Sequence, residues 1–198
     1  MKNFSILILA AGKGTRMNTP DTPKVLAPLM GKPLIYYVLT TALSLNPSKI
    51  LPIIGYKKEI VAEYIQSLNI SNIEFVEQNE QLGTWHAVDQ ARDAFSGQNE
   101  GVLILSGDVP LLSAATLQKF INFHFEVGAD LSVLSAKADN PFGYGRIIRT
   151  SDGEFENIVE EKDASAEQKI INEINSGIYF VNSALLFDSL SNVQNNNA

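Results

Sequence analysis

Short apolar runs alternate with amphipathic stretches along the first two thirds of the chain, and this alternation limits the possible folds more than any other feature. Aliphatic residues fill nearly every position of the runs, which predicts buried strands at 6–10, 49–54, 73–77, 102–106 and 130–138. The stretches between them predict helices at 33–45, 57–68, 84–95 and 113–127. Pro33 suits a first helical turn and Ser113 suits an N-cap. Strand and helix in repetition imply right-handed crossovers and a mostly parallel α/β sheet in three layers.

The pattern changes after about residue 139. Two short strands near Ile147 and Ile158 flank the turn Ser151-Asp152-Gly153, which predicts a hairpin, and a longer strand is expected over 170–181. Ligands of parallel α/β sheets gather beyond the carboxyl ends of the strands. We therefore expect these later strands to form a small β excursion that covers the ligand cleft.

The first expected strand runs directly into a loop that holds two glycines and two cations, since residues 9–17 read LAAGKGTRM. Gly12 and Gly14 permit a close approach to the backbone. Lys13 and Arg16, followed by Lys24, place positive charge beside backbone N–H groups, a combination that attracts phosphate. The spacing fits neither a dinucleotide fingerprint nor a P-loop. A phosphate-binding loop and a glycine-rich turn with solvated charges both fit this spacing.

One carboxylate stands at the end of the fourth expected strand, in Ser106-Gly107-Asp108-Val109-Pro110. The carboxyl ends of parallel strands share one edge of a sheet, so Asp108 is expected on the same edge as the loop after the first strand. Mg²⁺ is commonly held by one or two carboxylates plus substrate phosphates, which makes Asp108 a candidate ligand. The alternative is an aspartate that caps the next helix or shapes the turn, although Ser113 is the better cap.

A segment rich in side-chain amides, Gln78 to Thr84, follows the third expected strand and opens a helix. An amide presents a donor and an acceptor together, as the recognition of a nucleobase edge requires. Gly83 would permit close approach of a ligand. A polar loop with a helix cap at Thr84 explains the same residues without a ligand.

Composition narrows the function classes. With 198 residues, 45% of them hydrophobic, the chain can build one sizeable core and no more than one full domain. The net charge of −7 argues against nonspecific nucleic-acid binding, and the absence of cysteine excludes disulfides, thiolate metal sites and cysteine nucleophiles. The N-terminal apolar run is too short for a signal peptide, and no run approaches the ~20 residues of a membrane helix. We therefore expect a cytoplasmic protein with neither nucleic acid nor membrane as a partner.

Several motifs together closely resemble the N-acetylglucosamine-1-phosphate uridylyltransferase domain of bifunctional bacterial enzymes, within the sugar nucleotidyltransferase family. The first motif is typical of sugar nucleotidyltransferases in general, and the later ones are typical of this domain. The motifs are 9–17, Pro23-Lys24-Val25-Leu26, Gln81-Leu82-Gly83-Thr84, Gly107-Asp108-Val109-Pro110, Gly143-Tyr144-Gly145-Arg146, Ile158-Val159-Glu160 and Glu173-Ile174-Asn175. The resemblance implies a three-layer, Rossmann-like nucleotidyltransferase fold. It also implies a Mg²⁺-dependent reaction of UTP with N-acetylglucosamine 1-phosphate, which gives UDP-N-acetylglucosamine and pyrophosphate for cell-wall precursors.

The resemblance also implies roles for particular residues. Uridine would lie against Leu9, Ala10, Ala11 and Gly12, and uracil would be held by Gln78, Gly83 and Thr84. The catalytic residues would be Arg16, Lys24 and Asp108, with Lys24 on phosphate and Asp108 on Mg²⁺. The substrate site would comprise Ser106, Gly107, Asp108, Gly145, Glu160 and Asn175, the last three holding the amino sugar. A sugar phosphate already carries anionic oxygens at neutral pH, so the reaction needs no general base. Its main barrier is the repulsion between two anions, which Mg²⁺, Lys24 and Arg16 would offset.

Two features depart from the family pattern. Trp85 stands where the family usually has glycine. We expect it to pack beneath the helix, since large aromatic side chains are highly buried on average, and the alternative is a position at the border of the base or sugar pocket. His86 and His124 have no partners at metal-ligand spacing and are interpreted as structural.

The second departure is the end of the chain at Ala198. The family continues with a second metal ligand and with a β-helix acetyltransferase domain that forms trimers. Residues 1–198 are therefore expected to be a nucleotidyltransferase domain shortened at its C-terminus, and a monomer. Two other functions stay open: transfer to another sugar 1-phosphate, and a catalytically weak or regulatory nucleotide-binding module.

Overall fold

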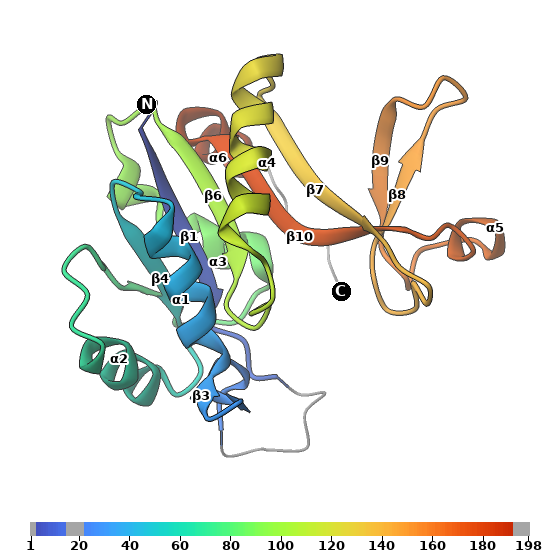
Figure 1. Cartoon of the computed structure of the whole chain (residues 1–198). Helices are drawn as coiled ribbons and strands as arrows, with labels where there is room; N and C mark the ends of the chain where they lie inside the picture. The colour runs from blue at the N-terminus through green and yellow to red at the C-terminus, as the bar shows by residue number, and fades with distance from the viewer. Residues whose placement is uncertain (1–2, 15–21, 192–198) are drawn as a thin grey trace. The chain divides into compact units, whose positions relative to one another are not determined.

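The computed structural model describes residues 3–14 and 22–191, which form two compact units. The first unit takes the chain up to Leu131 and from Phe180 onward, and the second is Ser132–Tyr179. Both are coloured along the chain in Figure 1. Within 3–14 and 22–191, no helix is both long and apolar enough to cross a membrane.

Parallel strands form the centre of the first unit. They are β1 (Phe4–Ala10), β4 (Ile50–Ile54), β5 (Val76–Glu77) and β6 (Gly101–Ser106), in the order β5-β4-β1-β6, with the end of β10 (Glu173–Asn182) beyond β6. In the register, Ile6 lies opposite both Ile50 and Leu103. All three side chains are fully buried, and each such aliphatic side chain contributes about 1.5–3 kcal/mol of burial free energy. The central strands therefore fix where their carboxyl ends emerge.

Helices cover both faces of this sheet, which confirms the predicted three layers. Figure 1 shows α1 (Leu34–Ser44) and α4 (Ala114–Val127) in front of the strands, with α3 (Thr84–Asp89) and α6 (Ser183–Leu190) behind them. α2 (Lys58–Ser67) contacts β4, and the short strands β2 (Pro28–Leu29) and β3 (Lys32–Pro33) pair with each other.

The start of α4 follows the predicted signal, whereas Pro33 precedes the first turn of α1, in which it was expected. Pro33 is the N-cap of α1, and the hydroxyl of Ser113 accepts a hydrogen bond from Thr116 N at 3.1 Å at the start of α4. The single helix predicted over 84–95 is wrong. α3 ends at Asp89, and Arg92–Phe95 forms a 3₁₀ turn. Hydrogen bonds between residues three apart, such as Ala91 N to Val88 O at 3.0 Å, replace the α-helical pattern there.

The second unit contains the predicted hairpin. β8 (Arg146–Arg149) and β9 (Phe155–Val159) pair in antiparallel register with Ile147 opposite Ile158, and β8 and β7 (Leu131–Lys137) both pair with β10. The sequence pattern did not predict α5 (Ala166–Lys169), whose first turn has a capping box between Ser165 and Gln168. The strand predicted over 170–181 begins only at Glu173, because the chain first leaves this short helix.

We expect an ion pair in the second unit to give it a pH dependence at acidic pH. Arg149 donates to both oxygens of Glu173 at 2.8 and 2.7 Å, and mainly this contact lowers the pKa of Glu173 from 4.5 to about 2. The folded-state pKa lies below the unfolded one, so the stabilisation is complete above about pH 4.5 and disappears as the pH falls towards 2. NMR titration of the Glu173 carboxyl should give a midpoint near 2, and Arg149→Met should move it towards 4.5. A midpoint that is the same in both proteins would contradict this role of Arg149.

Candidate functional site

A cavity of about 420 Å³ lies at the carboxyl ends of β1 and β6 in the first unit. Many of the predicted nucleotide and substrate residues line it: Leu9, Ala11, Gly12, Lys24, Gln78, Gly83, Thr84, Ser106 and Asp108. Ala10 is buried within β1 instead, and the backbone N–H of Gly107 donates to Leu9 O at 2.9 Å. Arg16 lies outside the described residues. The cavity therefore gathers residues from three strand ends at one edge of the sheet.

The two glycines after β1 differ in whether the backbone conformation and the neighbouring atoms require a glycine. Gly14 has a φ of +65°, and a Cβ there would lie 2.7 Å from Lys24 Cβ, so both its conformation and its neighbour require glycine. Gly12 has neither constraint, because an added Cβ would meet nothing within 4 Å. Packing within the described chain does not explain Gly12, and this residue lines the cavity.

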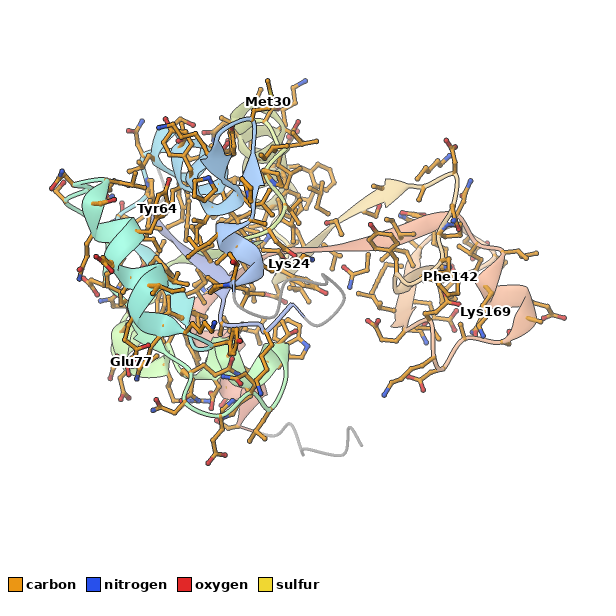
Figure 2. All side chains as sticks on the ribbon, turned by 90° about the horizontal axis from the view of Figure 1, so that it is seen from below. Lys24, Met30, Tyr64, Glu77, Phe142 and Lys169 are labelled. Atoms are coloured by element: carbon orange, nitrogen blue, oxygen red, sulfur yellow. The ribbon has the colours of Figure 1, made fainter. Side chains whose placement is uncertain are left out.

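Lys24 and Asp108 form an ion pair at the cavity wall. Lys24 lies on the 3₁₀ turn Lys24–Leu26 (Figure 2), and its Nζ contacts Oδ2 of Asp108, which follows β6. The two side chains are 42% and 24% exposed, so each can also reach a ligand in the cavity. Asp108 does not cap α4, since Ser113 does. Its position fits a role towards charged groups in the cavity better than the alternative of a capping residue.

The donor set tests whether Mg²⁺ fits here. Among the described residues, no group of three or more histidine, cysteine, aspartate or glutamate side chains could hold a metal ion. Asp108 alone would therefore supply one carboxylate, and ligand phosphate oxygens and water would complete the coordination. Such a partly open site is typical of Mg²⁺ in nucleotide-binding proteins.

Gln78 is held rigidly at the base of the amide-rich segment. Only 3% of the residue is exposed, and its Nε2 donates to Gly83 O at 3.2 Å and lies 3.1 Å from Nδ1 of His86. Gly83, with a φ of +107°, is the N-cap of α3. Because glycine has no side chain, no side-chain hydrogen bond caps this helix. Thr84 is the first residue of the helix, so the alternative interpretation of Thr84 as its cap is wrong.

The expectation of a buried tryptophan is wrong. Trp85 is 36% exposed and is the second residue of α3. His124 is only 5% exposed and packs edge-on against Phe180 and Phe125, which agrees with a structural role.

The three residues predicted for the amino sugar gather within the second unit. Asn175 N donates to Gly145 O at 2.8 Å, and a Cβ on Gly145 would lie 3.0 Å from Glu160 Oε1. The Asn175 amide donates to the hydroxyl of Tyr179 at 2.7 Å. Burial raises the pKa of the Tyr179 phenol; the bond from Asn175 lowers it, and the Glu160 charge raises it. The backbone here is thus tightly packed beside an exposed carboxylate.

Arg146, which the sequence did not single out as a site residue, supports this group. Arg146 is 1% exposed, donates to Glu161 Oε2 at 2.6 Å and to Lys169 O at 3.2 Å, and also donates to Tyr144 O. The hydrogen bond from Arg146 lowers the pKa of Glu161. Arg146 Nε has no hydrogen-bond partner among the described residues. The motif Gly143-Tyr144-Gly145-Arg146 includes Arg146, but the sequence of the motif does not show that this arginine is buried.

Comparisons with known proteins give close relatives of the whole chain. The bifunctional protein GlmU of Geotalea daltonii is 44% identical over 198 residues, which are all of this chain and 43% of the relative. GlmU of Streptococcus suis is 42% identical over the same length, 42% of that relative. This chain thus spans less than half the length of these curated relatives.

Solved structures share the fold. A putative glucose-1-phosphate thymidylyltransferase from Bacillus anthracis, in complex with a sucrose, superimposes with a TM-score of 0.75 at 22% identity, over 96% of this chain and 76% of that one. The predicted α/β fold with a mostly parallel sheet is therefore confirmed. The family model described as Nucleotidyl transferase matches residues 5–198. The chain belongs to the nucleotidyl transferase family.

Proposed function

We propose that the chain is a sugar-1-phosphate uridylyltransferase, which transfers uridylyl from UTP to N-acetylglucosamine 1-phosphate and releases pyrophosphate. One observation carries the proposal: a single cavity brings together a cation, a carboxylate, a buried amide and a glycine that packing does not require. The identity of 44% to a bifunctional GlmU supports this choice of substrates.

Different residues of the cavity would contact different parts of the nucleotide. Gly12 leaves room for the nucleotide against the backbone, and Gln78 offers its amide to the base. Lys24 would exchange its contact with Asp108 for a phosphate oxygen, and Asp108 would then be free to hold Mg²⁺. Bound Mg²⁺ neutralises negative charge on the phosphates. Arg16, by resemblance, would add a second cation there.

The reaction itself needs no protein base. An anionic oxygen of the sugar phosphate attacks the α-phosphorus of UTP, and the bond from that phosphorus to the bridging oxygen of pyrophosphate breaks. No proton must move, because the attacking oxygen is already ionised near neutral pH. Lys24 would stabilise the negative charge that spreads over the transferring group, and fixed charges of this kind supply most of the acceleration in phosphoryl transfer.

The second unit would supply the amino-sugar site, through Gly145, Glu160 and Asn175. The absence of a side chain at Gly145 lets the Glu160 carboxylate lie close to the backbone, and this ionised carboxylate is a strong acceptor for sugar hydroxyls. A nucleotide-binding module without turnover is a second candidate. It is favoured by the presence of one carboxylate, Asp108, among the described residues that line the cavity, since a loosely held metal would slow catalysis more than it weakens binding.

Two assays test the proposal together. Calorimetric titration should show binding of UTP and UDP-N-acetylglucosamine, and pyrophosphate release should be measured with a panel of sugar 1-phosphates and nucleoside triphosphates. We expect UTP with N-acetylglucosamine 1-phosphate to be the best pair. A preference for another sugar would reassign the acceptor, and binding without release would favour the second candidate. Absence of binding would refute both.

Glu160→Gln is expected to weaken UDP-N-acetylglucosamine about tenfold while it leaves the affinity for UDP unchanged. Loss of an ionised acceptor removes about 1.5 kcal/mol of hydrogen-bond free energy, and only the sugar makes that contact. Calorimetry with both ligands measures the difference. Glu156→Gln, an exposed glutamate on β9, is the matched control. If both ligands lose affinity equally, Glu160 does not contact the sugar.

A further inference from the structure

We propose that His86 sets the base preference of the cavity, because it holds the Gln78 side-chain amide in one orientation. The inference rests on the proposed function, in which Gln78 contacts the base. His86 lies on α3 and is not among the cavity-lining residues described above, so it would act through Gln78 as a positioning residue.

The neighbours of Gln78 determine which atom of its side-chain amide is the nitrogen and which is the oxygen. A carbonyl oxygen can only accept, so the atom 3.2 Å from Gly83 O must be the NH₂ nitrogen. The same Nε2 lies 3.1 Å from His86 Nδ1, which must then accept, so the proton of the neutral ring is on the other nitrogen. The side-chain nitrogen of Gln90 lies 3.3 Å from that other ring nitrogen, and two N–H donors that face each other make no hydrogen bond, so the shorter contact with the buried Gln78 is the one that sets the tautomer. Both hydrogens of the amide are therefore used within the protein.

The amide oxygen is the end left for a ligand. Both side-chain hydrogen bonds of Gln78 within residues 3–14 and 22–191 involve Nε2 and neither involves Oε1, and Gln78 lines the cavity. Gly83 O already accepts from Ala87 N at 3.1 Å as well as from Gln78. The start of α3 thus fixes the carbonyl, and the imidazole two residues into the helix supplies the second acceptor.

An oxygen in this position selects for a base that offers a donor. Uracil has N3–H, whereas cytosine has an unprotonated N3 that would face another acceptor. A reversed amide would present NH₂ and favour cytosine instead. Because only 3% of Gln78 is exposed, an unpaired polar group beside it costs free energy, and this cost favours UTP over CTP. Loss of the His86 acceptor would leave only Gly83 O to oppose reversal.

The test compares UTP and CTP affinities of the 198-residue chain by calorimetry. His86→Leu, which removes the acceptor, should reduce the UTP-to-CTP preference about fivefold, the effect of one neutral hydrogen bond. His86→Asn, which can place an oxygen near the position of Nδ1, should keep most of the preference. Gln90→Ala is the control at the C-cap of α3, since Gln90 contacts His86 but not Gln78.

A second measurement uses the unmodified chain, so it does not depend on whether a variant folds. The ¹⁵N shifts of the His86 ring in the unmodified chain should show Nδ1 unprotonated and Nε2 protonated. The opposite tautomer would overturn the inference, as would a UTP-to-CTP ratio that His86→Leu leaves unchanged. If the unmodified chain itself does not prefer UTP, the proposed function fails and this inference fails with it.

Discussion

Asp108→Asn is expected to abolish the gain in UTP affinity that Mg²⁺ provides, while UTP affinity without metal rises several-fold. In the structure Asp108 holds the Nζ of Lys24, so a phosphate must compete with the carboxylate for that cation. Asparagine removes this competition and also removes negative charge that repels the triphosphate. The rise is modest because half-exposed ion pairs contribute about 1 kcal/mol or less. Turnover should fall at least about a hundredfold, as when a group that stabilises developing charge is lost.

The measurement is a pair of UTP titrations for each protein, one with Mg²⁺ and one with EDTA. Opposite changes in the two titrations distinguish a metal ligand from a residue that only supports the fold, because unfolding would lower both affinities. Asp93→Asn is the control, since Asp93 is exposed on the 3₁₀ turn and does not line the cavity. A full Mg²⁺ effect in Asp108→Asn would show that the metal assignment is wrong.

The local parts of the fold could be predicted from the sequence. The apolar run of β1, the N-cap at Ser113 and the hairpin around Gly153 each depend on residues close together in the chain, and all three are present in the structure. The short helix α5 was missed although its capping box was readable in the sequence, because four residues carry no apolar periodicity. The strand prediction therefore extended over residues that leave that helix.

The sequence could predict many residues of the candidate site, but it could not predict which of their side chains contact one another. Parallel strands bring their carboxyl ends to one edge, so the sequence could place Asp108 near the loop after β1. Nothing in the local pattern shows that Lys24 contacts Asp108, or that Arg146 is buried against Glu161. Such contacts depend on side-chain packing between distant segments. Trp85 illustrates the same limit, since average burial of tryptophan does not decide one exposed position at a helix start.

Lys24→Met is expected to lower UTP affinity at least tenfold and turnover about a hundredfold or more, while uridine binding stays unchanged. Lys24 is the cation at the phosphate end of the proposed site, and a charged hydrogen bond contributes about 1.5–3 kcal/mol. Methionine keeps most of the apolar stem that approaches Gly14 and removes only the charge. The loss in turnover exceeds the loss in binding because the charge acts most strongly on the transition state.

The two charges should also be coupled, which gives Lys24→Met a sharper test than its own loss of affinity. In the single variant, Asp108 is left without its cation and repels the triphosphate, so Asp108→Asn in the same chain should raise the UTP affinity measured in EDTA by a larger factor than it does when Lys24 is present. Lys32→Met removes an equal charge from the β2–β3 hairpin, outside the cavity, and should change neither ligand. Equal losses of uridine and UTP affinity in Lys24→Met would mean that Lys24 supports the whole pocket and does not act on phosphate. Additive effects of the two substitutions in the double variant would mean that the ion pair has no part in ligand binding.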